Sequence, residues 1–203
     1  MRVSRIWATA VSTALFVGLP AGAARGDEAK FSLDHPFALV DADGKTVTSA
    51  DFRGNWLLIY FGYTHCSDQC PTALSAMAEA LDQFGPAASH IQPLFITVDP
   101  ERDRGPMLRA FTAAFDERLI GLTGTQEQIA AIAHALGVNY EKVLLDTDDY
   151  VVDHSSTLSA IDPSGHAVTF KMAEPYMIAA KLLELLNRSD AALGTVNNLN
   201  AYR

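Results

Sequence analysis

Short apolar runs alternate with amphipathic segments along most of the chain. The runs 56–61 (WLLIYF) and 91–98 (IQPLFITV) have the length and composition of strands that are buried on both faces. Between them, the segment 72–81 has apolar residues at helical spacing. Strand, helix and strand in this order predict a parallel pair of strands that is joined by a crossover helix, as in an α/β fold.

The flanking segments complete this picture. An N-terminal hairpin is predicted over 37–48, where two arms with apolar residues surround the turn signal Asp43-Gly44. Thr125 and Gln128 have the spacing of a capping box and predict the start of a helix. The other patterns predict helices over 104–116, 125–136 and 175–186 and strands over 119–122, 138–145, 151–161 and 167–170. Together these elements predict an α/β fold with a central mixed sheet and helices on both faces.

The N-terminal segment 1–25 has the pattern of a secretory signal. Arg2 and Arg5 precede an apolar run over 6–19, and small residues follow, ending in 21–23 (AGA). This pattern predicts a cleaved signal peptide; a second interpretation is that residues 6–19 remain as an anchor in the inner membrane. Under either interpretation we expect the folded part to lie outside the cytoplasm, in a bacterial periplasm.

The remaining length and charge limit what the protein can be. Roughly 180 residues suit one domain, which we predict over 26–188 with a polar C-terminal tail over 189–203. The formal net charge of the whole chain is -9. Because an acidic surface repels phosphate groups, we expect no nucleic acid partner.

The two cysteines of the chain, Cys66 and Cys70, lie where the first buried strand meets the following helix. Pro71 suits the first turn of that helix, and a helix N-terminus lowers the pKa of a nearby thiol. A structural disulfide is the ordinary interpretation outside the cytoplasm. A bridge across so short a loop would constrain the unfolded chain only weakly, so we favour a functional site with two thiols.

Histidines are the first candidates to complete such a site, because copper and zinc bind thiolate and neutral imidazole. His154 lies just before the closing hairpin, in the segment that approaches the cysteine motif in thioredoxin-like proteins. Ser156 occupies the place of the cis-proline of those proteins. His65 precedes Cys66 directly and is a weaker candidate.

Acidic residues near these positions have possible supporting roles. Asp68 and Asp153 are candidates for orienting the cysteine loop or the histidine, although exposed surface acids would have the same pattern. The segment 99–103 (DPERD) follows the second buried strand, and we expect it to form a loop of ion pairs that braces the site.

Three segments resemble, in order and spacing, the signatures of the Sco/SenC family of copper-delivery proteins. They are 61–71 (FGYTHCSDQCP), 95–103 (FITVDPERD) and 152–155 (VDHS), and the resemblance extends over about 37–186. It implies a thioredoxin-like fold outside the cytoplasm. One departure is Ser67, where the family commonly has proline, and this change should loosen the loop without removing a ligand.

The resemblance also implies a function. The protein would bind one copper ion through Cys66, Cys70 and His154. It would deliver the ion to the dinuclear copper centre in subunit 2 of cytochrome c oxidase, or help to assemble that centre, or pass the ion to another copper acceptor. Other copper chaperones are possible partners. Two soft thiolates and one imidazole suit trigonal Cu(I) and can also hold Cu(II) if the site stays partly open. Without metal, the two thiols are close enough to form a redox-active disulfide.

Three alternatives stay open. A thiol-disulfide oxidoreductase would use Cys66 and Cys70 to reduce the cysteines of the acceptor, without needing His154. A peroxidase shares the predicted fold but has a lone activated cysteine beside threonine and arginine. A zinc protein could use the same three ligands, although no general base is evident near the motif. We therefore expect a metallochaperone rather than an enzyme.

Overall fold

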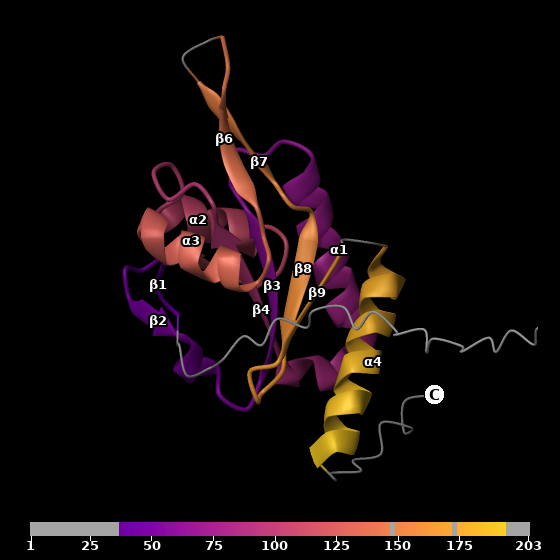
Figure 1. Ribbon diagram of the computed structural model, residues 1–203. Coiled ribbons are helices and arrows are strands. Elements are labelled where there is room, and N and C mark those ends of the chain that lie inside the picture. The colour runs from indigo at the N-terminus through magenta and orange to yellow at the C-terminus, as the bar shows by residue number, and fades with distance from the viewer. Residues whose placement is uncertain (1–36, 147–148, 172–173, 194–203) are drawn as a thin grey trace, which may run out of the picture.

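A seven-stranded mixed sheet forms the centre of the molecule, as a computed structural model of the chain shows (Figure 1). The structure describes residues 37–146, 149–171 and 174–193. The order of the strands is β2-β1-β5-β4-β3-β8-β9. These strands are β1 (Ala38–Asp41), β2 (Thr46–Thr48), β3 (Trp56–Gly62), β4 (Ile91–Thr97), β5 (Ile120–Thr123), β8 (Thr157–Ile161) and β9 (Ala167–Lys171). The predicted α/β class and the N-terminal hairpin of β1 and β2 are confirmed.

The middle strands are parallel and almost entirely buried. β3 pairs with β4, and β4 with β5, in parallel, whereas β8 pairs with the other side of β3 in the antiparallel direction. Leu58, Ile59 and Leu94 in these strands are 0% exposed. Because both faces are covered, the strands are continuous apolar runs instead of alternating ones.

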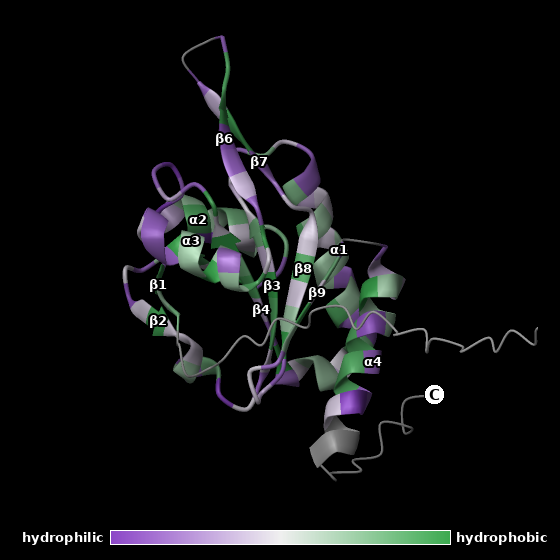
Figure 2. Cartoon of the chain, viewed as in Figure 1, coloured by the Kyte–Doolittle hydropathy of each residue, from purple (hydrophilic) through white to green (hydrophobic). Residues whose placement is uncertain are grey.

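Helices cover both faces of the sheet. In Figure 1, α1 and α4 lie together on one face, and α2 and α3 lie on the other. Figure 2 shows hydrophobic residues alternating with hydrophilic ones along α1 and α4, as expected of helices with one buried side. The helices are α1 (Gln69–Phe84), α2 (Gly105–Ala113), α3 (Gln126–Ala135) and α4 (Pro175–Leu193), with short 3-10 helices η1 (Ser49–Phe52) and η2 (Gly85–His90).

The single strand predicted over 151–161 is wrong. Its first part belongs to β7 (Tyr150–His154), which pairs with β6 (Tyr140–Leu144) in a separate two-stranded sheet, and its second part is β8. Between the two strands, the backbone N–H of Ser155 donates to the carbonyl of Asn139. The chain therefore leaves the hairpin after Ser155 and enters the main sheet at Thr157.

The last helix is longer than predicted. It continues past residue 186 to Leu193, into the segment predicted as a polar tail. Arg188 and Glu184 form an i,i+4 ion pair that supports the additional turns. The sequence favours this extension, because no glycine or proline occurs between Pro175 and Gly194.

The predicted signal peptide or anchor, over 1–25, lies outside the described residues, and so does 194–203. The domain boundaries therefore stay predictions. Within the described ranges, no helix is both long enough and apolar enough to cross a membrane.

Thr125 caps α3, as its spacing to Gln128 predicted. Its hydroxyl accepts a hydrogen bond from the backbone N–H of Gln128, and the Gln128 side chain accepts one from the backbone N–H of Thr125. We expect Thr125→Ala to lower the free energy of unfolding by about 1 kcal/mol in urea denaturation. Thr125→Ser keeps the hydroxyl and should change it little; equal losses in both variants would contradict the capping role.

Candidate metal centre

The two cysteines lie where the chain leaves β3, Cys66 before α1 and Cys70 in its first turn. Cys70 is 0% exposed, whereas Cys66 is partly exposed. The backbone N–H of Cys70 donates to the sulfur of Cys66 at 3.3 Å, so the Cys66 sulfur satisfies one of the free donors at the helix N-terminus. Both cysteines are free thiols.

His154 reaches the cysteines from the end of β7. Its Nε2 lies 3.4 Å from the sulfur of Cys70, and its Nδ1 lies 3.2 Å from the carbonyl oxygen of Ser155. The rings of Tyr60 and Tyr63 meet the imidazole edge-on at centroid distances of 6.0 and 6.2 Å. A proton on Nδ1 can donate to the Ser155 carbonyl, which leaves the lone pair of Nε2 facing the thiols.

The three predicted ligands meet at one point. Their ligand atoms, two sulfurs and one imidazole nitrogen, all lie within 4.8 Å of one another. Two ligands that each lie about 2.3 Å from a common ion are separated by at most about 4.6 Å. Small adjustments would therefore bring Cys66, Cys70 and His154 onto one metal ion.

Burial sets the charge of these groups in the metal-free protein. It lowers the pKa of His154 below its ordinary value of 6.5, so the imidazole is neutral at neutral pH and ready to bind a metal. Contrary to the lowering expected at a helix N-terminus, burial raises the pKa of the Cys70 thiol to about 12, with the hydrogen bond to Cys66 adding to the effect. A metal ion must therefore displace a proton from Cys70, and losing the ion returns that proton.

Gly62, the last residue of β3, makes room for the buried thiol. A Cβ atom at this position would lie 2.9 Å from the sulfur of Cys70 and 2.9 Å from Cε2 of Phe95. Both distances are shorter than van der Waals contact allows. Only glycine therefore lets Cys70 pack against the end of the strand.

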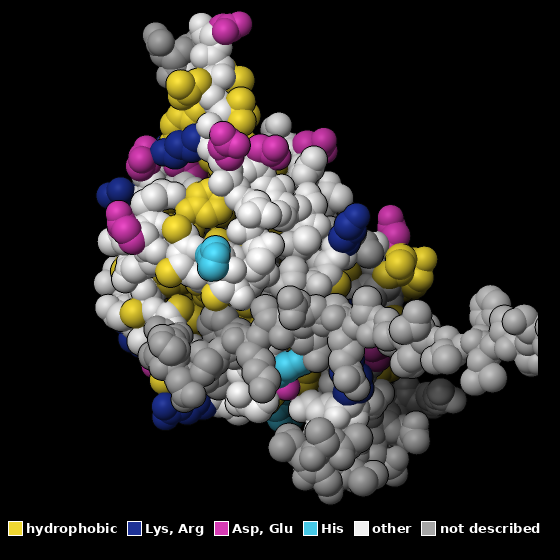
Figure 3. All heavy atoms as spheres, viewed as in Figure 1, with side chains coloured by type: hydrophobic (Ala, Val, Ile, Leu, Met, Phe, Trp, Pro, Cys, Tyr) yellow, Lys and Arg dark blue, Asp and Glu magenta, His cyan; other side chains and the backbone are white. Residues whose placement is uncertain are grey.

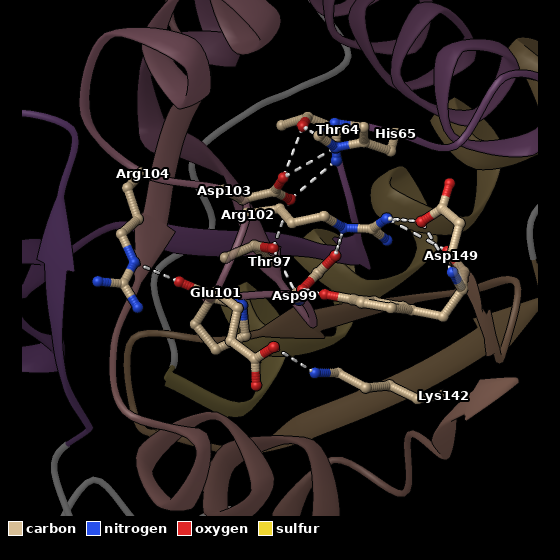
Figure 4. Close-up of polar contacts among 12 residues, drawn as sticks. Thr64, His65, Thr97, Asp99, Glu101, Arg102, Asp103, Arg104, Lys142 and Asp149 are labelled. Carbon is tan, nitrogen blue, oxygen red and sulfur yellow. Dashed lines mark hydrogen bonds and ion pairs between the residues drawn. The ribbon is translucent and has the colours of Figure 1, made fainter. Parts of the chain in front are cut away.

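Asp103 braces the loop that precedes Cys66. This carboxylate is 0% exposed and follows the end of β4, next to the end of β3. It accepts hydrogen bonds from the backbone N–H of Thr64 at 2.8 Å, from the Thr64 hydroxyl at 2.5 Å and from the Thr97 hydroxyl at 2.6 Å. These contacts, drawn in Figure 4, hold the cysteine loop onto the sheet.

The neighbouring Arg102 braces the strand that ends in His154. Its guanidinium lies 3.7 Å from the ring centroid of Tyr150, and its Nη1 donates to the Tyr150 carbonyl at 3.2 Å and to Asp149 at 3.1 Å. Its Nε donates to the buried Asp99, which also accepts a hydrogen bond from the Tyr150 hydroxyl at 2.8 Å. The bracing role predicted for the 99–103 segment is confirmed, and it extends to both halves of the site.

Other predicted residues lie outside this group. His65 is exposed, and its Nδ1 faces the Thr64 hydroxyl at 3.1 Å. Asp68 and Asp153 are exposed too, and in the described part of the chain neither carboxylate hydrogen-bonds to a thiol or to the imidazole. Asp153 acts on His154 through its charge, which opposes the lowering of the pKa by burial. The contact that orients the ring comes from Ser155.

Sequence reasoning missed Gly62, Tyr60 and Ser155. The two β3 residues carry a usable signal, because alternate positions at the carboxyl end of a buried strand point toward the following helix. No sequence signal exists for Ser155, because it contributes a backbone carbonyl that any residue would provide.

Comparison with known proteins identifies the family. The family model SCO1/SenC matches residues 25–187. The chain belongs to the SCO1/SenC family. The mitochondrial protein SCO2 homolog of Homo sapiens is 42% identical over 132 residues, 64% of this chain and 50% of that protein. The SCO2-like protein of Rickettsia felis is 40% identical over 131 residues, 64% of each chain. The chain spans about half the length of most curated SCO relatives that it matches.

Solved structures of the SCO1/SenC family share the thioredoxin-like fold described above. Copper-bound ScoI of Arabidopsis thaliana superposes with a TM-score of 0.70 at 34% identity, covering 75% of this chain and 97% of that chain. Copper-bound ScoI of Bradyrhizobium japonicum superposes with a TM-score of 0.66 at 38% identity, covering 73% and 96%.

The close approach at Gly62 can be tested with a matched pair of variants. We expect Gly62→Ala to displace the Cys70 sulfur and to weaken the binding of Cu(I), used as a probe, by about 10- to 100-fold. Gly121→Ala in β5 is the control, because its Cβ would lie 2.8 Å from Leu108, in the core contact with α2. Both variants should lose stability in urea denaturation. Wild-type Cu(I) affinity in Gly62→Ala would contradict the role of this glycine.

Proposed function

We propose that this protein is a copper chaperone, which binds one copper ion through Cys66, Cys70 and His154. In this proposal it delivers the ion to the dinuclear copper centre in subunit 2 of cytochrome c oxidase. The observation on which it rests is the convergence of the three ligand atoms within 4.8 Å. The copper-bound structures of related ScoI proteins support the choice of metal.

The donor set fits copper. Two thiolates and one imidazole are soft or borderline ligands, and three of them give the trigonal geometry that suits Cu(I). Cu(II) would be held by the same atoms with a further ligand from the exposed side. The phenol of Tyr60 and the ring of Tyr63 shield the imidazole, so the open side lies next to Cys66.

Unequal burial of the two thiols suits release of the ion. An acceptor ligand would approach from the side of the partly exposed Cys66, while the buried Cys70 still holds the ion. When the copper leaves, Cys70 binds a proton, which its raised pKa favours. The protein would thus exchange ligands one at a time and never release free copper.

The proposal also places copper delivery in the periplasm. The signal-like pattern over 1–25 supports a periplasmic protein, either cleaved or anchored by residues 6–19. Copper would reach it from another copper chaperone or from the free ion in that compartment.

A second candidate is a thiol-disulfide reductase that uses Cys66 and Cys70 to reduce the cysteines of the acceptor. The two free thiols, whose sulfurs lie within 4.8 Å of each other, favour it. The raised pKa of Cys70 counts against it, because a thiol that exchanges readily has a pKa near the ambient pH.

Ligand variants test the proposal. We expect Cys66→Ser and Cys70→Ser to abolish Cu(I) binding. We expect His154→Ala to lower the Cu(I) affinity by more than about 100-fold, because mutating a residue that only hydrogen-bonds to a metal ligand already lowers metal affinity about 10- to 100-fold. Competition with a chromogenic Cu(I) chelator under reducing, anaerobic conditions measures these affinities. His134→Ala, at an exposed position of α3, is the matched control.

The same variants separate the two candidate functions. Wild-type copper affinity in His154→Ala would contradict the assigned ligands. A reductase predicts that His154→Ala still reduces the disulfide of the oxidised subunit 2 domain at the wild-type rate, while a chaperone predicts that this variant no longer delivers copper to it.

A further inference from the structure

The β6-β7 hairpin projects from the body of the molecule and has two distinct faces (Figure 1). Its register places Val143 opposite Val151 and Glu141 opposite Asp153. Directly opposed residues in antiparallel strands point to the same side. These four residues therefore share one side of the hairpin, which we call the outer face.

The inner face is occupied by contacts with the body. Besides His154 near the cysteines, Lys142 pairs with Glu101 at 2.9 Å (Figure 4). Tyr150 contacts Arg102 and Asp99. The hairpin is therefore fixed relative to the metal ligands. A protein bound to its outer face would have a defined position relative to the copper site.

The outer face exposes hydrophobic side chains. Val143 is 43% exposed, Val151 39% and the adjoining Leu145 44%. Leu144, opposite Tyr150 on the other side of the hairpin, is 81% exposed. Figure 3 shows hydrophobic side chains gathered on the projecting hairpin, above a row of charged ones. Adjacent exposed apolar residues rimmed by charges are typical of a protein interaction site.

The outer face also has an uncompensated charge. Glu141 and Asp153 are directly opposed acids, an arrangement that destabilises a two-stranded sheet. In the described part of the chain, neither acid forms an ion pair with a lysine or arginine, and the neighbouring Lys142 pairs with Glu101 on the inner face. A cationic side chain from a partner would remove this repulsion.

We propose that the outer face is the docking surface for the copper acceptor, and that the acceptor presents an apolar patch flanked by lysine or arginine. This inference rests on the function proposed above. The apolar pair supplies contact area, and the acidic pair selects a basic partner and orients it. Asp153 directly precedes the ligand His154 at the end of β7, so a partner held at the outer face reaches the copper site around the end of that strand.

The apolar half is tested with the double variant Val143→Thr/Val151→Thr, which keeps side-chain shape and β propensity. The Cu(I)-loaded protein is mixed with the reduced copper-binding domain of subunit 2, and the transfer rate is measured by stopped flow. We expect the rate at subsaturating acceptor to fall about tenfold. Transfer to a small Cu(I) chelator should keep its wild-type rate. Leu183→Gln, at a position of α4 that is 44% exposed, is the matched control.

The charged half is tested with Glu141→Gln and Glu141→Lys. Because steering by charge is screened by salt, the wild-type transfer rate should fall as ionic strength rises. This dependence should be weaker in Glu141→Gln and weaker still in Glu141→Lys, with the rate to the chelator unchanged. A dependence equal to that of the wild type would overturn the role of the acidic pair.

The other outcomes are distinct. Wild-type transfer to the domain by Val143→Thr/Val151→Thr would overturn the docking surface but leave the proposed function intact. A slower rate to both domain and chelator would place the defect in the copper site and overturn the docking role. Failure of the wild type itself to transfer copper to the domain would overturn the proposed function and, with it, the assigned occupant.

Discussion

The contact between the imidazole of His154 and the sulfur of Cys70 joins segments that are 84 residues apart in the chain. The two segments belong to different parts of the fold. The cysteines lie where a strand meets a helix, and the histidine lies at the end of a two-stranded hairpin outside the main sheet. Everything that the site can do depends on holding these two segments together.

Two adjacent residues provide that restraint. Asp103 fixes the cysteine loop through Thr64, and Arg102 fixes the hairpin through Tyr150. Both follow the end of β4, the parallel neighbour of β3, so the sheet itself positions them. Hydrogen bonds within a buried network strengthen one another. Each of these contacts therefore makes the others more rigid.

Much of this arrangement could be predicted from the sequence. The apolar run over 56–61 predicted a buried strand, and the cysteines were correctly placed at its junction with a helix. His154 was predicted both from its place before the closing hairpin and from the resemblance to the family. The pairing of β7 with β6 could not be predicted, because apolar periodicity shows that a segment is a strand but not which strand it pairs with. The burial of Asp99 and Asp103 was unexpected too, since it depends on partners distant in sequence.

The two faces of the β6-β7 hairpin have different roles. Its inner face brings His154 to the two cysteines, and its outer face presents apolar and acidic side chains to the solvent. A carrier needs both properties, because copper passes between proteins only when their ligands lie within bonding distance. Placing the ligand and the docking surface on one strand would link recognition of the acceptor to the position of the ion.

The most direct test of the central claim, that the three residues form one copper site, is X-ray absorption spectroscopy of the Cu(I)-loaded protein beside His154→Ala. The account predicts two sulfur ligands and one imidazole nitrogen in the wild type, and loss of the nitrogen in the variant. Sulfur ligands alone in the wild type, or the same nitrogen signal in both proteins, would contradict it.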